Sequence, residues 1–216
     1  MKLAIIGAGN VGGTLGAVWA QKAGHDVFFG VPDPRDPKTQ HLLKSLGQNV
    51  RAGTVAEAAA AADIIVLATP WPATKNAIQR AGNLTGKVVV DCTNPLKEGV
   101  SGLALGYTTS GAEQVAEWAG GAKVFKALNQ AGFNIMAKPI FDGQRAVMFV
   151  CGDDAGQKSI VLKLVAEIGF EAIDAGGLLI ARLLEPYAML WIHLAYRQGV
   201  GREFAFGLLK HRNDAS

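Results

Sequence analysis

The sequence predicts an α/β protein with a doubly wound, largely parallel sheet. Short β-branched runs alternate with longer segments of helical periodicity, and most of the runs are continuously apolar, as in Ile64–Ala68. Such a strand must be buried on both faces, as when helices cover both sides of a parallel sheet. The chain also holds 27 glycines in 216 residues. A left-handed cap residue is common between a helix and the next strand, and five of the glycines stand at such places: Gly24, Gly47, Gly86, Gly121 and Gly169. This alternation predicts right-handed βαβ units.

The pattern predicts eight strands and seven helices. The strands are expected at Lys2–Ile6, Asp26–Phe29, Asn49–Ala52, Asp63–Thr69, Lys87–Cys92, Lys123–Ala127, Arg145–Cys151 and Glu171–Asp174. The helices are expected at Val11–Lys22, Pro37–Leu46, Val55–Ala61, Ala73–Ala81, Gly111–Trp118, Ala155–Ile168 and Leu178–Gln198. Thr54 with Glu57 predicts a capping box, and Asp153 and Asp154 offer N-caps for the helix that follows them.

Composition and charge exclude several classes of function. The net charge is only +3 and the Lys and Arg residues are scattered, whereas a nucleic-acid binder clusters them on one face. No stretch of about 18 uncharged apolar residues suggests a membrane span. Leu178–Tyr196 carries three polar or charged side chains and is interpreted as a buried helix that Pro186 interrupts. Cys92 and Cys151 lie in apolar runs without a C-x-x-C motif, which favours reduced core residues and a cytoplasmic location.

A glycine fingerprint follows the first strand directly. Gly7-Ala8-Gly9-Asn10-Val11-Gly12 is G-x-G-x-x-G and opens the first predicted helix, which is the context that a dinucleotide-binding site requires. Gly7 permits the tight turn, Gly9 lets a pyrophosphate approach the backbone, and Gly12 lets the helix pack on the strand. The helix N-terminus then presents free N–H groups to the phosphates. The motif predicts a Rossmann-type domain.

The end of the second strand bears on which dinucleotide binds. An NAD-binding chain commonly has Asp or Glu there, whereas this strand ends Phe29-Gly30-Val31-Pro32. The missing acid favours NADP, with Val31 at the tip and with Arg35 and Lys38 within reach of a 2′-phosphate. NAD remains an alternative, because Asp33 and Asp36 stand nearby and the two cations could simply be solvated.

Three later strand ends are expected at the same edge, where ligands bind in open α/β sheets. Thr69-Pro70-Trp71 follows the fourth strand, Asn94 the fifth, and Leu128-Asn129 the sixth. Trp71 either walls the cofactor or covers the next helix. Asn94 could donate to a carboxamide, although Asn-Pro is also an ordinary turn.

The sequence shows no acid–base or metal-ligand constellation. No G-x-S-x-G elbow and no metal-ligand spacing is visible, so we assign no catalytic side chain and no metal. His25 is expected to be structural, and His193 to be a core histidine. Hydride exchange between two held redox coenzymes needs mainly ring placement, since the cofactors carry the chemistry.

These residues together resemble the NADPH-dependent reductases of the 8-hydroxy-5-deazaflavin coenzyme (coenzyme F420), to which the reductase domains of the STEAP metalloreductases are related. The resemblance covers essentially the whole chain. It rests on Gly7–Gly12, Ala68–Trp71, Val150–Asp154, Ile173–Gly176 and the Arg182-Leu183 helix.

The resemblance implies a dinucleotide-binding domain over residues 1–176 and a helical appendage over residues 177–216 that closes over the crevice. A deazaflavin would lie in an apolar pocket between them. By position, Gly9, Asn10 and Val11 would contact the pyrophosphate, Thr69-Pro70-Trp71 would wall the site, and Leu128-Asn129 would face the nicotinamide. The family commonly has Ser/Thr-Arg for the 2′-phosphate where this chain has Val31-Pro32, so Arg35 or Lys38 would have to take that place. The deazaflavin reductases have His where this chain has Asn129, so a flavin is an alternative acceptor.

The predicted function is hydride transfer between NAD(P)H and a deazaflavin or flavin-like acceptor. One alternative is a non-catalytic NADP(H) sensor, which would have a closed crevice. Another is an imine or hydroxyacid reductase, although such enzymes often append a larger helical domain. The expected partner is a small-molecule acceptor, with neither nucleic acid nor membrane. We expect a homodimer, with Trp191 of the last helix either at the contact or in the core.

Overall fold

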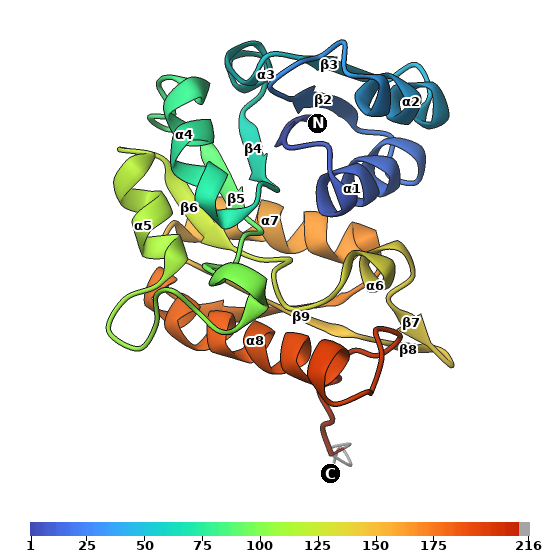
Figure 1. Cartoon of the computed structure of the whole chain (residues 1–216), viewed down its shortest axis with the longest axis vertical. Helices are drawn as coiled ribbons and strands as arrows, with labels where there is room; N and C mark the ends of the chain where they lie inside the picture. The colour runs from blue at the N-terminus through green and yellow to red at the C-terminus, as the bar shows by residue number, and fades with distance from the viewer. Residues whose placement is uncertain (212–216) are drawn as a thin grey trace.

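An eight-stranded sheet forms the centre of the protein in a computed structural model that describes residues 1–211 (Figure 1). Its strands are β1 (Lys2–Ile6), β2 (Asp26–Gly30), β3 (Val50–Gly53), β4 (Ile64–Leu67), β5 (Val88–Asp91), β6 (Lys123–Lys126), β9 (Val147–Gly152) and β10 (Glu171–Gly176). Their order is β10-β9-β6-β5-β4-β1-β2-β3, and all neighbours are parallel except β6 and β9. The predicted fold class is confirmed, and the first six strands have the Rossmann order.

Helices cover both faces of this sheet. They are α1 (Asn10–Gln21), α2 (Pro37–Leu46), α3 (Val55–Ala61), α4 (Trp71–Ala81), α5 (Gly111–Trp118), α6 (Phe133–Ala137), α7 (Ala155–Ile168) and α8 (Ala181–Arg197), with 3-10 turns η1 (Glu98–Val100) and η2 (Leu178–Ile180). A small hairpin joins β7 (Ile140–Phe141) to β8 (Gln144–Arg145). The capping box of Thr54 and Glu57 is confirmed, and Asp154 caps α7. The sequence did not predict α6, η1 or the hairpin.

Two apolar cores result, one on each face of the sheet. The first lies under α1, α6 and α7 and centres on Trp19, whose indole N–H donates to the carbonyl of Leu164 at 3.0 Å. The second lies under α3, α4 and α5 and includes Ala58, Ile78 and Val115. The continuously apolar strands supply both cores, as their pattern predicts.

Helix α8 takes part in both cores. Leu184 belongs to the core under α5, whereas Trp191 belongs to the core under α1, so α8 runs across an end of the sheet (Figure 1). The expected interruption at Pro186 is wrong, because the helix continues through it. Trp191 is buried, and its indole N–H donates to the carbonyl of Phe204 at 2.9 Å. Of the two roles considered for Trp191, the core role is the one observed.

The outer face of α8 carries exposed apolar side chains. Leu178–Arg197 is long and apolar enough to cross a membrane by length and composition alone, and 39% of that window is buried. The prediction of a buried helix is therefore right for one face only. Leu179, Leu183 and Leu190 are exposed.

Histidine and cysteine placements test further predictions. The ring of His25 lies 3.2 Å from the terminal amine and 2.7 Å from a Glu167 carboxylate oxygen, so its structural role is confirmed. The core assignment of His193 is wrong, because its ring is exposed beside Gln198. Cys92 and Cys151 are both buried, as predicted. Burial raises the pKa of Cys151 to about 12 and that of Cys92 still further.

Candidate functional site

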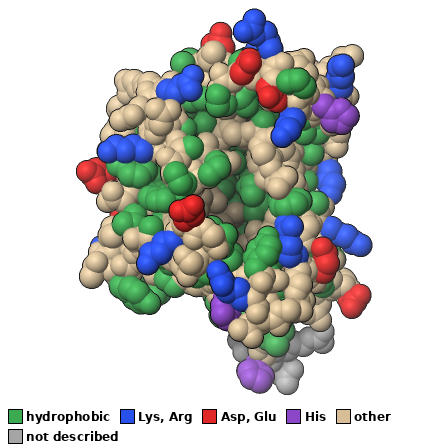
Figure 2. Space-filling model, viewed as in Figure 1, with side chains coloured by type: hydrophobic (Ala, Val, Ile, Leu, Met, Phe, Trp, Pro, Cys, Tyr) green, Lys and Arg blue, Asp and Glu red, His purple; other side chains and the backbone are tan. Residues whose placement is uncertain are grey.

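A crevice opens at the carboxyl ends of β1, β4 and β5. Its volume is about 620 Å³. Its walls are Gly9–Val11 after β1, Ala68–Pro72 after β4, and Cys92–Asn94 with Leu96–Val100 after β5. Figure 2 shows the surface hollowed near the middle of this face, with hydrophobic side chains gathered around the hollow. The ends of β1, β4 and β5 therefore meet in one cavity, as expected, whereas the residues after β6 do not line it.

Two glycines of the fingerprint are required by the fold itself. Gly7 has φ +106° and donates its N–H to the carbonyl of Gly30 at 3.0 Å. A Cβ there would lie 2.7 Å from the Ala68 carbonyl oxygen, and a Cβ on Gly12 would lie 2.0 Å from that of Gly7. A side chain at either position would therefore push the loop away from Ala68 or push α1 away from the loop.

Gly9 is different, because nothing in the protein excludes a side chain there. A Cβ on Gly9 would meet no atom within 4 Å, and its backbone is extended with φ −76°. Within residues 1–211, no side chain caps α1 at Gly9, and no acidic residue stands in its first turn. The first-turn N–H groups and the positive end of the helix dipole thus meet the crevice uncovered, which fits a pyrophosphate.

The end of β2 carries cations whose neighbouring acids bind backbone. Asp36 caps α2 by accepting from the N–H groups of Lys38 and Thr39, and Asp33 accepts from the N–H of Arg35. Arg35 is 94% exposed, and its Nε lies 3.7 Å from Asp33. Val31 is buried. Val31, Arg35 and Lys38 lie outside the lining of the crevice, so their assignment to the cofactor remains a prediction.

Thr69, Pro70 and Trp71 form the β4 side of the crevice. The Thr69 hydroxyl lies 2.9 Å from that of Thr74, which donates to the Pro70 carbonyl. Trp71 lines the crevice and also packs on Trp118 of α5, with ring centroids 5.3 Å apart. Trp71 is thus the first residue of α4 and a wall of the crevice, and its role toward a cofactor remains a prediction.

The ends of β5 and β6 are joined by an amide pair. Asn94 donates to the Asn129 carbonyl at 2.8 Å, and Asn129 donates to the side-chain oxygen of Asn94 at 3.0 Å and to the Leu184 carbonyl at 3.3 Å. Asn94 lines the crevice, but Leu128 and Asn129 are buried behind its wall. Leu128 has φ +59°, a conformation that costs a bulky residue energy and turns the chain sharply here.

A second pocket adjoins the crevice and shares residues with it. This cavity, called the second pocket below, has a volume of about 570 Å³. Asn10, Val11, Leu96, Gly99 and Val100 line both cavities. The remaining walls are mostly apolar or aromatic, and they come from the segment after β6, from α8 and from Arg202: Ala131, Gly132, Phe133, Trp191, Ile192, Tyr196, Arg197 and Arg202.

Behind these cavities lies a buried ionic cluster. The ammonium group of Lys126 lies 2.8 Å from Asp91 and 2.9 Å from Glu185, and it donates to the Thr93 carbonyl at 2.7 Å. All three charged residues are 0% exposed. Glu185 also accepts from the first two N–H groups of α5, at 2.8 and 3.0 Å. The cluster therefore fastens α8 to the ends of β5 and β6.

Electrostatics keep Lys126 charged. Burial alone would lower the pKa of Lys126, but the attraction of Asp91 and Glu185 outweighs it, and the pKa lies above its usual value. The sequence analysis missed the cluster. A signal was present, since Asp91 ends an otherwise apolar strand, Lys126 ends the next strand after two apolar residues, and Glu185 interrupts an apolar helix.

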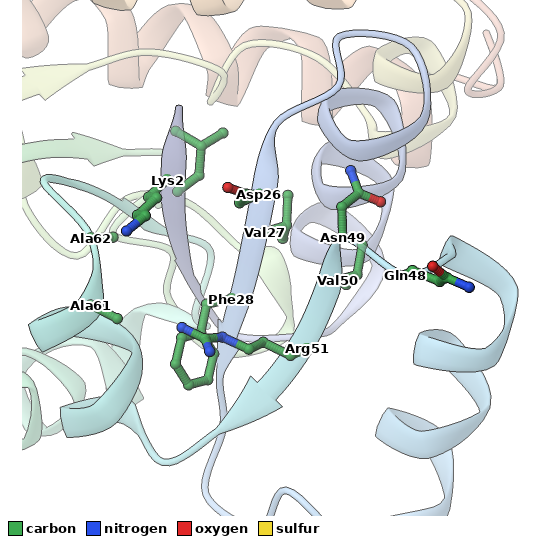
Figure 3. Close-up of a pocket in the computed structure, with 11 residues that line it drawn as sticks. Lys2, Asp26, Val27, Phe28, Gln48, Asn49, Val50, Arg51, Ala61 and Ala62 are labelled. Carbon is green, nitrogen blue, oxygen red and sulfur yellow. The ribbon is translucent and has the colours of Figure 1, made fainter.

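Another cavity lies at the opposite edge of the sheet, by the amino ends of β1, β2 and β3. It measures about 330 Å³, and Figure 3 shows residues that line it, among them Lys2, Asp26 and Arg51. The guanidinium of Arg51 lies over the ring of Phe28 at 4.1 Å. None of the predicted site residues lines this cavity. Within residues 1–211, no group of three or more His, Cys, Asp or Glu could hold a metal.

Comparison with known proteins gives concordant matches. Residues 2–95 match the family model described as NADP oxidoreductase, coenzyme F420-dependent. The chain is 29% identical to the F420-dependent NADP reductase of Methanothermobacter thermautotrophicus, over 93% of this chain and 91% of that protein. It is 30% identical to the metalloreductase STEAP3 of Rattus norvegicus over 85% of this chain and 36% of that protein.

A crystal structure with the same fold also matches. It is an Arthrobacter sp. FB24 protein provisionally assigned as an F420-dependent NADP reductase, with a TM-score of 0.87 and 32% identity. The alignment covers 97% of this chain and 100% of that one.

Proposed function

We propose a function from one premise: the chain belongs to the family of coenzyme F420-dependent NADP oxidoreductases. It is an NADP-dependent oxidoreductase whose electron acceptor is a deazaflavin of the F420 type. In this reaction NADPH passes a hydride to the acceptor ring, a proton comes from solvent, and NADP⁺ and the two-electron-reduced acceptor are formed.

The observation that carries this proposal is the pairing of an uncovered fingerprint loop with an adjoining apolar pocket. Gly9 faces open space and α1 is uncapped there, so Gly9, Asn10 and Val11 are the residues to hold the pyrophosphate. Asn10 and Val11 also line the second pocket. A nicotinamide in the crevice and a planar ring in the second pocket would therefore meet beside them.

The side chains of this protein hold and orient the two rings, and none of them exchanges a proton with either ring. Thr69, Pro70 and Trp71 form one wall, and Asn94, kept in place by Asn129, offers amide groups to the nicotinamide. Apolar walls around the second pocket exclude water from the transferred hydride. Positioning of two rings in contact then supplies the rate enhancement, without a catalytic acid or base.

We infer that the phosphate of NADP is recognised beyond β2. Arg35 and Lys38 are exposed there, while Asp33 and Asp36 are occupied by backbone N–H groups. Neither acid stands at the tip of the strand, so a 2′-phosphate meets two cations. This supports NADP over NAD.

We also propose that residues 177–216 act as an appendage that closes the acceptor side, because α8 lines the second pocket through Trp191, Ile192 and Tyr196. Leu183 and Leu190 on the outer face of α8 are exposed, as is Leu179 of η2. They replace the buried Trp191 as the candidate contacts of a cytoplasmic homodimer. We propose no nucleic-acid or membrane partner.

The experiment that tests this function separates binding from turnover. NADPH and NADH are titrated by tryptophan fluorescence, and NADPH oxidation is then assayed with F420, FMN and FAD. We expect NADPH to bind more tightly than NADH, Trp71→Phe to lose most of the quenching, and F420 to be the fastest acceptor. Binding without turnover of any acceptor would support the sensor alternative, although the open crevice speaks against it.

A further inference from the structure

Two arginines line the second pocket, and no acidic residue does. Arg197 and Arg202 stand among its apolar walls. Within residues 1–211, neither guanidinium lies within 4.0 Å of a carboxylate. Arg197 donates only a long hydrogen bond, 3.4 Å, to the Gly99 carbonyl. The pocket therefore carries two positive charges that the described part of the chain leaves uncompensated.

Arg202 is held firmly although it lacks a counterion. Its guanidinium carbon lies 4.6 Å from the ring centroid of Phe133 and 5.7 Å from that of Tyr196. Its backbone carbonyl accepts from Asn134, and the same Asn134 amide also binds the Glu203 carboxylate at 2.8 Å. The side-chain oxygen of Asn134 also accepts a long hydrogen bond, 3.5 Å, from Nη2 of Arg202. Asn134 therefore binds the Glu203 carboxylate and steadies the guanidinium that lines the pocket.

One nitrogen atom of Arg202 lacks a hydrogen-bond partner among the described residues. This atom is the buried Nε. Buried N–H groups of native proteins nearly always have a partner, and an unsatisfied one costs free energy. A guanidinium that is stacked on aromatic rings and left with free N–H groups suits a phosphate or carboxylate ligand.

We propose that Arg202, assisted by Arg197, binds an anionic group on the side chain of the acceptor and so selects charged acceptors over uncharged ones. This inference rests on the proposed function, because it assigns the acceptor ring to the second pocket. The ligand class is a planar redox ring that bears a phosphate or carboxylate chain. The pyrophosphate of the dinucleotide is the other possible source of such an anion, because Asn10 and Val11 also line this pocket.

The test compares acceptors that share a ring and differ in charge. FMN is paired with riboflavin, and F420 with its deazaflavin lacking the phosphate-bearing side chain. Dissociation constants are measured by fluorescence with saturating NADP⁺, and KM values by NADPH oxidation. We expect Arg202→Met to weaken FMN and F420 about 10- to 100-fold, the range for a hydrogen bond to a charged group. Riboflavin, the truncated deazaflavin and NADPH should bind Arg202→Met as tightly as they bind the wild type. Arg202→Lys should recover part of the lost affinity for FMN and F420.

Arg51 provides a matched control. It also stacks on a phenylalanine ring, at 4.1 Å, but lies at the opposite edge of the sheet (Figure 3). Arg51→Met removes the same charge and should leave every constant unchanged.

Three outcomes would overturn the assignment. The first is that Arg202→Met weakens charged and uncharged acceptors equally, which indicates a structural role. The second is that NADPH weakens as much as FMN and F420, which assigns the anion to the dinucleotide. The third is that no constant changes. If the wild-type protein binds none of the four acceptors, the proposed function fails as well, so the two failures are distinguishable.

Discussion

Replacing Lys126 with methionine removes the charge that holds the buried cluster together. The side chain keeps its length, but Asp91 and Glu185 lose contacts of 2.8 and 2.9 Å and remain fully buried. Each keeps other donors: Thr93 for Asp91, and the N-terminus of α5 for Glu185. Two carboxylates then share a site from which water is excluded.

The cost follows from that burial. Breaking a buried ion pair by removing one partner costs about 3–5 kcal/mol, because a charge is left uncompensated. A domain has only about 5–15 kcal/mol of stability in total, so Lys126→Met should be close to unfolding. Denaturant unfolding monitored by circular dichroism gives the free energy directly. As a control, Lys163→Met removes a 69%-exposed lysine that lies 3.9 Å from Glu167, and it should change the stability by less than about 1 kcal/mol.

The pH dependence provides a second readout. Without Lys126, uptake of a proton by the buried carboxylate pair removes an uncompensated buried charge. The folded variant then binds more protons than the unfolded chain, so its stability should rise as the pH is lowered from 7 towards 5. A loss below about 1 kcal/mol, or a deficit independent of pH, would refute the account of the cluster as a buried charged unit.

Three further predictions follow from other contacts. Arg35→Ala combined with Lys38→Ala should weaken NADPH roughly tenfold and leave NADH unchanged, as measured by fluorescence titration; equal effects on both dinucleotides would contradict the assignment. The hydrogen bond from Arg182 lowers the pKa of Glu113 below its ordinary value of 4.5. This carboxylate therefore stabilises the fold above that pH, and the stabilisation is lost as the pH falls further. In Glu113→Gln, the unfolding midpoint should therefore fall less steeply than in the wild type as the pH is lowered into the acid range. Burial raises the pKa of Cys151 to about 12, so a thiol reagent should modify it at pH 8 only in denaturant, and rapid labelling of the folded protein would contradict this.

Local patterns were enough to predict the frame of the fold. All eight strands of the sheet lie where apolar β-branched runs predict them, and α2, α3, α5 and α7 have the predicted bounds. The five glycines expected between helices and strands all have positive φ: Gly24, Gly47, Gly86, Gly121 and Gly169. Such features depend on a few neighbouring residues, so sequence alone carries them. The polar composition of His211–Ser216 predicts a frayed tail, but residues 212–216 lie outside the described residues.

Features that depend on distant residues escaped prediction. The ion cluster joins residues from β5, β6 and α8, and no local pattern brings them together. The segment between Pro95 and Ser110 has no periodicity, yet η1 within it lines both cavities. Trp191 and His193 stand two positions apart in an apolar helix, and only packing decides that one is buried and the other exposed.

The central claim is that the fingerprint loop holds the pyrophosphate of NADP in the crevice, and Gly9→Ala tests it most directly. A methyl group there meets no atom of the protein within 4 Å, so the unfolding midpoint should not change. NADPH affinity, measured by titration, should fall at least about tenfold because the methyl occupies the space of the phosphates. Gly120→Ala is the control, since its Cβ also meets nothing but lies outside the crevice. A folded Gly9→Ala protein that binds NADPH as tightly as wild type would contradict the claim.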